Sequence, residues 1–275
     1  SYIDASVYMR TAMVRCDASL NAKTDLYKIP ISKNTIFMKD YTDIHKLAKK
    51  RIQIEKEIAL QKVLDLIATG VDVQSPEQLH IRGTVSCGKN VKFDVNVIIE
   101  GDVKLEDDVM IGANCILRNC TIGKGTSINP FSLVDESVIG ENCYVGPYAR
   151  IRPNVLIGNY VQIGNFVEIK NANIGSKSRI NHHAFVGDAD LADQVTIGAG
   201  TITCNHDGVR INRTTIGRGA YVGSGCNLVA PLMVNANATI ASGSTITKEV
   251  AADTLTIARS RQVKVENWKG PKSRE

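Results

Sequence analysis

The chain has 275 residues, which is enough for one or two domains of ordinary size. A hydrophobic fraction of 43% and a charged fraction of 22% allow a folded core and exclude a disordered chain, and an aromatic fraction of 5% makes that core aliphatic. The net charge of +5 is too small to indicate nucleic-acid binding. No apolar run of about 18 residues predicts a membrane span.

The first residues and the cysteines bear on the compartment. No basic stretch followed by an apolar run marks a signal peptide in this sequence. Seven cysteines are scattered along the chain without a CxxC pair, which favours reduced thiols. We therefore expect a cytoplasmic protein, and no metal site.

Residues 1–40 show no clean period, and a helix is predicted over 41–70. Thr42 or Asp43 is expected to cap its start, and Gly70 to end it. Basic residues near its start are expected to form a solvated face rather than a binding patch: Lys46, Lys49, Lys50 and Arg51. Apolar residues recur along it at Ile44, Leu47, Ile54, Ile58, Val63, Leu66 and Ile67.

A hexapeptide repeat dominates the sequence from about Val85 to Ile246. A helix would repeat every 3.6 residues and an ordinary strand every two, so a period of six indicates short flat sides joined by tight corners. Five-residue steps that recur about once every three sides indicate a triangular prism with parallel strand ladders and one aliphatic core. The inward positions include Leu105, Ile111, Leu117, Ile122, Ile128, Val134, Ile139, Val145, Ile151, Ile157, Ile163, Ile169, Ile174, Ile180, Val186, Leu191, Ile197, Ile216, Val222, Leu228, Val234, Ile240 and Ile246.

The period breaks once, between Thr203 and Ile216, where the chain has too many residues for one side of the prism. Such a segment must leave the prism as a loop. Loops that project from a rigid scaffold often carry function, although a tolerated insertion is the alternative.

Several stretches carry a resemblance to a known family: IRGT (81–84), NVIIEG (96–101), ARIRP (149–153), GNFVEIK (164–170), GAGTITCN (198–205), VAP (229–231) and Arg259. From about Lys50 to Trp268 the chain resembles the acetyltransferase half of the bifunctional N-acetylglucosamine-1-phosphate uridyltransferase / glucosamine-1-phosphate acetyltransferase. That half has an all-β fold, a left-handed parallel β-helix of hexapeptide repeats after a long α-helix. The resemblance divides the chain into a short segment (1–40), a linker helix and prism entry (41–80), the β-helix (81–250) and a tail (251–275).

The resemblance implies acetyl transfer from acetyl-CoA, as cosubstrate, to the amine of glucosamine 1-phosphate, a step of UDP-N-acetylglucosamine and cell-wall precursor synthesis. His182 falls on the family's catalytic histidine, and a neutral imidazole is a suitable base near pH 7. We expect His183 to point to the opposite face of a strand. Arg152 and Lys170 match ligands of the sugar phosphate. The family's assembly implies a homotrimer with active sites between subunits.

Other matches lie on the loop and toward the end of the chain. Asn205 matches an asparagine beside the reacting amine, and backbone N–H groups of the same loop are expected to form the oxyanion hole. Ser224 and Arg259 match positions that bind coenzyme A, with Arg259 on a phosphate.

The chain also departs from the family pattern on the sugar side. Phe185 replaces a tyrosine, Thr196 an asparagine, and His206 a second tyrosine. The family's loop lysine falls on Ile211, with Arg210 and Arg213 close by, and Ser242 replaces an alanine beside coenzyme A.

These departures leave two alternatives: an N-acetyltransferase for a different amino sugar, or a truncated paralogue with a structural or regulatory role. The second is prompted by the absence of a glycine-rich triphosphate loop, because of which we expect no uridyl transfer from this chain.

Overall fold

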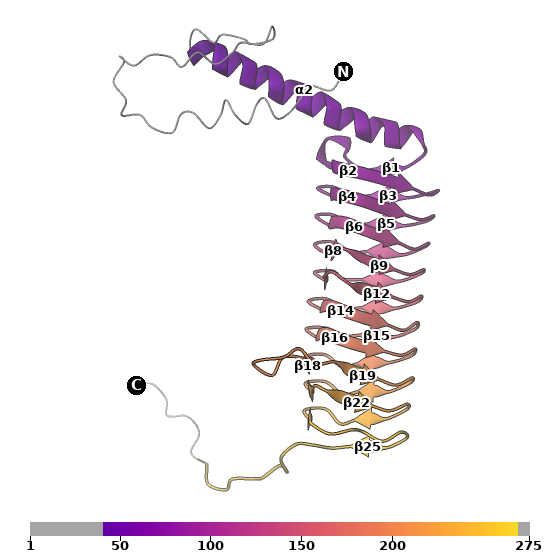
Figure 1. The fold of residues 1–275 in the computed structure, drawn as a ribbon, viewed down its shortest axis with the longest axis vertical. Coiled ribbons are helices and arrows are strands. Elements are labelled where there is room, and N and C mark those ends of the chain that lie inside the picture. The colour runs from indigo at the N-terminus through magenta and orange to yellow at the C-terminus, as the bar shows by residue number, and fades with distance from the viewer. Residues whose placement is uncertain (1–40, 269–275) are drawn as a thin grey trace, which may run out of the picture. The chain divides into compact units, whose positions relative to one another are not determined.

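The structure is a computed structural model that describes residues 41–268 (Figure 1). Contacts divide the chain into two units, Ser1–Ile52 and Gln53–Glu275. The segment 1–40 singled out in the sequence lies outside the described residues. Helix α2 spans Tyr41–Ala68, so Thr42 and Asp43 lie inside it and are not its caps. Gly70 ends the helix as predicted, with a φ of 96° and an N–H group that donates to the Ile67 carbonyl.

The apolar residues of α2 are buried only near its end. Val63 is fully buried and Leu66 is 9% exposed, and both join the hydrophobic core. Leu47, Ile54 and Ile58 are 42%, 44% and 56% exposed, so the apolar residues that recur along the helix do not form one buried face.

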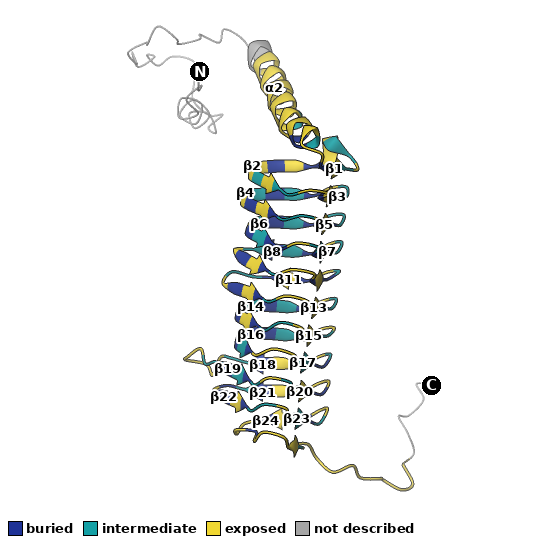
Figure 2. Cartoon of the chain, turned by 90° about the vertical axis from the view of Figure 1, so that its right-hand side faces the viewer, coloured by how far each residue is buried: buried dark blue, intermediate teal, exposed yellow. Residues whose placement is uncertain are grey.

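Most of the second unit is a stack of three-sided coils (Figures 1 and 2). Its first face, within the described residues, is an 11-stranded parallel sheet. The strands are β1 (Asp72–Val73), β3 (Lys92–Phe93), β5 (Met110–Ile111), β7 (Ser127–Ile128), β10 (Tyr144–Val145), β13 (Gln162–Ile163), β15 (Arg179–Ile180), β17 (Thr196–Ile197), β20 (Tyr221–Val222), β23 (Thr239–Ile240) and β25 (Leu255–Thr256). A short 3₁₀ helix, η1 (Pro76–Gln78), lies in the first coil.

A 14-stranded sheet in the same part of the chain bends to form the second and third faces. Face 2 alone holds β8 (Leu133–Asp135), β11 (Arg150–Ile151), β18 (Ile202–Cys204), β21 (Asn227–Val229) and β24 (Thr245–Ile246). Face 3 alone holds β9 (Ser137–Ile139), β12 (Val155–Ile157), β19 (Thr214–Ile216) and β22 (Leu232–Val234). The strands that run through both are β2 (His80–Cys87), β4 (Ile98–Leu105), β6 (Ile116–Ile122), β14 (Glu168–Ile174) and β16 (Phe185–Leu191). We call the turn from face 1 to face 2 corner 1, and that from face 2 to face 3 corner 2.

The interior of the prism holds the repeating aliphatic residues. Every predicted inward position from Leu105 to Ile246 is buried, and none is more than 4% exposed. Parallel register stacks each of these residues on its equivalent in the next coil, for example Ile163 on Ile180. The predicted fold class, a left-handed parallel β-helix after a long helix, is confirmed.

The corners are tight because one residue in many of them has a left-handed backbone. At corner 1 these include Phe131, Tyr148, Phe166 and His183, with φ between 56° and 62°. Their rings stack in series with centroid separations of 4.8, 5.0 and 5.0 Å. Stacking compensates for a conformation that side chains with a Cβ rarely adopt.

The break in the repeat is a loop, as predicted. β18 ends at Cys204 and β19 begins at Thr214, and the segment between them projects from the stack (Figure 1). The coils on both sides keep their register, because Thr196 pairs with Arg179 before the loop and with Tyr221 after it.

Six cysteines lie in the described residues, and all of them are free thiols. Burial raises the pKa of Cys115 to about 11 and that of Cys120 to about 12, so these thiols stay protonated at neutral pH. Within 41–268, no helix has the length and apolar character needed to cross a membrane.

Replacing Ile163 tests the core. Ile163→Ala is expected to lower the free energy of unfolding by about 2–5 kcal/mol, because the side chain is 1% exposed and its loss leaves a cavity between stacked coils. Denaturant titration followed by circular dichroism measures the loss. Gln162→Ala, on the exposed side of the same strand, is the control and is expected to stay within about 0.5 kcal/mol of the parent. Equal losses in the two variants would contradict the inward assignment.

Candidate functional site

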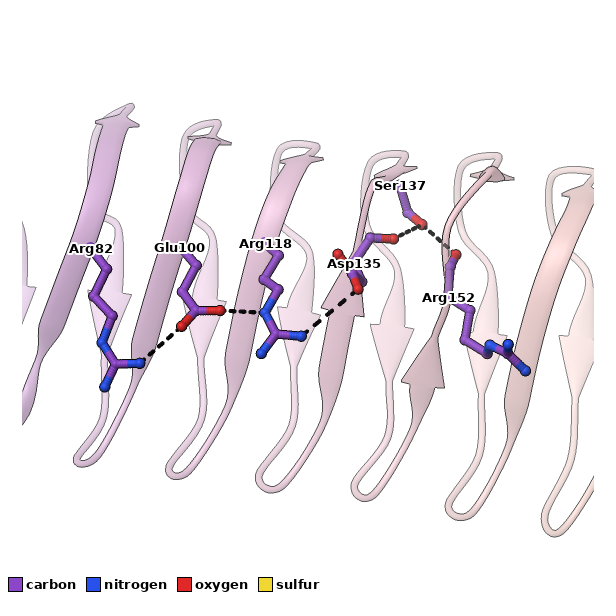
Figure 3. Close-up of polar contacts among 6 residues, drawn as sticks. All are labelled: Arg82, Glu100, Arg118, Asp135, Ser137 and Arg152. Carbon is purple, nitrogen blue, oxygen red and sulfur yellow. Dashed lines mark hydrogen bonds and ion pairs between the residues drawn. The ribbon is translucent and has the colours of Figure 1, made fainter. Parts of the chain in front are cut away.

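A ladder of alternating charges runs up the outer side of face 2 (Figure 3). Arg82 contacts Glu100 at 2.9 Å, Arg118 pairs with the other Glu100 oxygen, and Arg118 Nη1 lies 3.9 Å from Asp135. Hydrogen bonds from Arg118 and Arg82 hold the pKa of the Glu100 carboxyl below its usual range. Each charge in this part of the ladder is balanced by a neighbour one coil away.

This pairing of opposite charges between neighbouring coils ends at Arg152 and Lys170. The Arg152 guanidinium turns to Glu168, with Nη1 at 2.8 Å from Oε1, and its carbonyl accepts a hydrogen bond from the Ser137 hydroxyl (Figure 3). Lys170 occupies the same column one coil on and has no ion-pair partner among the described residues. The next position of the column is Gly187, which has no side chain. A cation without an ion-pair partner is suited to bind an anion.

Gly187 also brings two predicted site residues together. A Cβ placed on Gly187 would lie 2.6 Å from Phe185 Cζ and 3.1 Å from Asn205 Nδ2. The Phe185 ring therefore lies over the glycine, beside the Asn205 amide. Only a residue without a side chain leaves room for both groups here.

His182 lies in the corner 1 turn between β15 and β16, and it is exposed. A Cβ on Gly164, one coil earlier, would lie 2.8 Å from His182 Nδ1 and 3.2 Å from its Cε1. The Nδ1–Cε1 edge of the His182 ring therefore packs against the Gly164 backbone. The His182 carbonyl accepts a hydrogen bond from the Gly200 N–H, which ties the turn to the next coil.

The expectation that His183 points to the opposite face of a strand is wrong. His182 and His183 both lie in the turn, where side chains do not alternate, and both are exposed. The His183 ring stacks on Phe166 at 5.0 Å and 20°, at the end of the aromatic series. His183 therefore packs on the Phe166 ring, whereas His182 packs on the Gly164 backbone.

The residues matched to coenzyme A lie together farther along corner 1. Ser224 and Ser242 occupy, in later coils, the turn position that His182 occupies. The Ser224 N–H donates to Ser242 Oγ at 3.1 Å, and Arg259 Nη1 donates to the Ser242 carbonyl at 2.7 Å. Since neighbouring coils are about 4.8 Å apart, His182 lies about 10 Å from the Ser224 turn and about 15 Å from the Ser242 turn. One corner thus carries an exposed imidazole and, farther along, an exposed cation.

The loop between β18 and β19 is a closed hairpin that uses its own N–H groups. The N–H groups of Val209 and Arg210 donate to the Asp207 carboxylate, and the Gly208 N–H donates to His206 Nδ1. The Asn212 N–H donates to the Asn205 carbonyl. Hydrogen bonds from the Arg210 N–H, the Val209 N–H and the Asn212 side chain, in that order, hold the pKa of Asp207 below its usual range. The N–H groups of Gly208, Val209, Arg210 and Asn212 are therefore already bonded within the hairpin.

Two residues that the sequence analysis did not assign to the site anchor this loop. Arg213 forms a bidentate ion pair with Asp190, and its Nη1 also donates to the Asn171 carbonyl at 3.2 Å. Arg213 was a possible replacement for the family's loop lysine, but Asp190 occupies its guanidinium. Asp188 is 4% exposed and accepts hydrogen bonds from the side-chain amides of Asn171 and Asn205. The sequence could have drawn attention to Asp188, because Asn119, Asn154 and Asn171 occupy the same corner 2 position in other coils.

Thr196 and His206 are the predicted sugar-side residues that have no contact with the others among the described residues. Thr196 lies in β17 on face 1, whereas Arg152 and Lys170 lie on face 2. Corner 1 separates the two faces.

Comparisons with known proteins agree with the resemblance read from the sequence. The family profile "GMPPB C-terminal domain" matches residues 81–152, and "Bacterial transferase hexapeptide (six repeats)" matches 136–171. The chain is 47% identical over 206 residues to the "Bifunctional protein GlmU" of Aromatoleum aromaticum, covering 75% of this chain and 45% of that protein. It is 46% identical over 218 residues to the protein of the same name from Acinetobacter baumannii, covering 79% and 48%. The chain thus spans about half the length of the curated relatives it matches, and the similarity to one half of a bifunctional protein is confirmed.

Removing the loop anchor is expected to open the hairpin. Arg213→Ala should speed tryptic cleavage after Arg210 several-fold, because the bidentate pair with Asp190 no longer holds the end of the loop. Mass spectrometry of timed digests measures the rate. Arg218→Ala, which removes a cation outside the loop, is the control. Unchanged cleavage in Arg213→Ala would show that the hairpin is held by other contacts.

The same anchor predicts a pH dependence. Hydrogen bonds and charge from Arg213 hold the pKa of Asp190 below its usual range. The stabilisation is therefore complete above the ordinary carboxyl pKa of about 3.9 and is lost only as the pH falls through the lower folded value. Amide hydrogen exchange in 205–213, corrected for intrinsic rates, should stay constant from about pH 7 to 5 and rise below about 4. Loss of protection near pH 5 would contradict the lowered pKa.

Proposed function

We propose that this chain is a CoA-dependent amino-sugar N-acetyltransferase, which transfers the acetyl group of acetyl-CoA to the amine of glucosamine 1-phosphate. The observation that carries the proposal is the position of an exposed imidazole, that of His182, between two groups of residues suited to bind a ligand. The Ser224–Ser242–Arg259 cluster follows it along corner 1, and the unbalanced Lys170 lies on the adjoining face. The similarity to "Bifunctional protein GlmU" over three quarters of the chain supports the same function.

The acceptor enters as a neutral amine, because an ammonium has no lone pair for attack. Its nitrogen attacks the carbonyl carbon of the thioester, so that the C–N bond forms and the C–S bond breaks. His182 takes the proton that the amine loses and returns a proton to the departing thiolate sulfur. Gly164 seats the imidazole, so the base is positioned by packing against the backbone.

The phosphate of the acceptor is bound by Lys170, with Arg152 beside it. Lys170 has no carboxylate partner in residues 41–268, so its charge is available to a phosphate oxygen. Arg152 is a weaker ligand in this state, because Glu168 already occupies one of its nitrogens. Phe185 offers only a ring where a hydroxyl would bind, so the phosphate depends on these cations. Asn205 faces the amine.

Coenzyme A extends along corner 1 from His182 to Arg259. A guanidinium next to two serine turns is suited to a phosphate group at the far end of the cofactor. The intervening length of about 15 Å fits the pantetheine arm, with the thioester at the imidazole. The product feeds the synthesis of UDP-N-acetylglucosamine and cell-wall precursors. A cytoplasmic location follows from the use of acetyl-CoA and agrees with the free thiols.

A homotrimer completes the site. Thr196 and His206 contribute to an acceptor pocket with Lys170 only if a second copy brings face 1 or the loop against face 2. Light scattering should therefore give about three times the 29.9 kDa chain mass at micromolar concentration. A mass of one chain under these conditions would contradict both the assembly and the shared site.

A different amino sugar is the second candidate acceptor, and two observations favour it. Phe185 lacks a hydroxyl, and Arg213 does not replace the missing loop lysine because Asp190 binds it. Release of free coenzyme A thiol with a panel of amino sugars separates the candidates. Release with glucosamine 1-phosphate supports the first, release only with another amine supports the second, and no release with any amine contradicts both.

Substituting the base tests the mechanism. His182→Ala is expected to lower kcat by about 10²–10⁴-fold, because a positioned base contributes that much, while coenzyme A binding and assembly stay intact. His183→Ala is the matched control and should be much milder, since its ring stacks on Phe166 instead. Near-normal turnover in His182→Ala would contradict the assignment. Loss of activity in His206→Ala instead would move the base to the loop.

A further inference from the structure

Asp188 is a buried carboxylate with no part in the chemistry described so far. It lies in β16 at corner 2, is 4% exposed, and has a left-handed backbone with a φ of 49°. Neither oxygen has an ion-pair contact, although the Arg213 charge lies near: Oδ1 accepts from Asn171 Nδ2, and Oδ2 accepts from Asn205 Nδ2. The left-handed angle is shared by the equivalent residues of other coils, but a buried carboxylate held by two side-chain amides is particular to this one and is costly unless its hydrogen bonds compensate its burial.

The chemistry of the two groups fixes the orientation of Asn205. An ionised carboxylate only accepts hydrogen bonds, so the amide must turn its NH₂ group toward Asp188. The carbonyl oxygen, Oδ1, then points away from Asp188 and has no hydrogen-bond partner among the described residues. The backbone around it is fixed too, because the Asn205 N–H donates to the Thr203 carbonyl at 3.0 Å and the Asn205 carbonyl accepts from Asn212.

We infer that Asp188 is a positioning residue for acetyl transfer: it locks the Asn205 side chain with its carbonyl oxygen toward the acceptor amine. The inference rests on the proposed function and deepens it. A neutral amine carries two hydrogens, one of which goes to His182 while Asn205 Oδ1 accepts the other. A hydroxyl has a single hydrogen, which the base requires, and would leave the Asn205 oxygen unpaired. The pair Asp188–Asn205 therefore selects an amine over a hydroxyl as the nucleophile.

A double-mutant cycle tests whether Asp188 acts through Asn205. Asp188→Asn keeps the shape but can donate, so the Asn205 amide is free to turn over. We expect kcat to fall by about tenfold with the KM for acetyl-CoA unchanged. In an Asn205→Ala background the same substitution should have no further effect. Losses that multiply in the double variant would mean that Asp188 acts independently of Asn205, and would overturn the inference.

Glu136→Gln is the matched control. Glu136 occupies the same left-handed corner 2 position three coils earlier, far from Asn205, and the substitution likewise removes one charge without changing the shape. Its kcat should equal that of the unsubstituted protein. A fall in kcat as large as that of Asp188→Asn would make the effect a general one of corner charge and would overturn the inference.

A measurement on the unsubstituted protein keeps the two proposals distinguishable. The Asn205 side-chain NH₂, assigned in NMR spectra by its absence from Asn205→Ala, should exchange slowly with water because it is bonded to a buried carboxylate. Fast exchange in an active protein overturns the role of Asp188 alone. Failure of the unsubstituted protein to acetylate any amino sugar overturns the proposed function, and with it the catalytic consequence drawn for Asn205, whatever the exchange rate.

Discussion

Parallel stacking of one coil on the next is the constraint on which the rest of the molecule depends. The register puts each residue over its equivalent in the previous coil, as when Ile163 pairs with Ile180 and Lys170 with Gly187. An inward position must therefore be aliphatic in coil after coil, because a polar residue there would be buried without a partner. The same rule acts on the outside, where equivalent positions become ladders of charges, amides or rings about 4.8 Å apart.

A ladder of this kind offers a binding site where its side chains are not paired with those of the neighbouring coils. The charges of face 2 neutralise one another from Arg82 to Asp135, and that part of the face has nothing left for a ligand. The pairing changes at Arg152, which pairs with Glu168, and Lys170 is left without a charged neighbour in the next coil, where Gly187 follows it. A similar change occurs at corner 1, where the stacked rings end at His183 and the same position is glycine in the next three coils, at Gly200, Gly225 and Gly243. The space these small residues leave is what an extended cosubstrate requires.

The sequence predicted what repetition determines. The six-residue period predicted the buried aliphatics, the three faces and the projecting loop, because each follows from an average over many coils. The resemblance brought Ser224, Ser242 and Arg259 together correctly, since those positions are fixed by register. What the sequence did not predict depends on single contacts: the turn that holds His182 and His183, and the exposure of Leu47 and Ile58 on the long helix. Asp188 and the pairing of Arg213 with Asp190 were not predicted, because these partners lie one coil away in space but many residues away in sequence.

The contacts of the loop between β18 and β19 explain why the coil is interrupted at this place. A regular coil presents only one short strand to face 2, and its outward side chains point straight out from the sheet. Asn205 instead leaves the strand at corner 2, where Asp188 of the coil below holds its amide and Arg213 closes the hairpin behind it. The extra residues thus let a side chain reach Gly187 from the edge of face 2, which the period of six does not allow. Since the anchors belong to the coil just before the loop, the insertion is tied to the scaffold at the coil that also carries His182, so the base and the amide keep a fixed relation to each other.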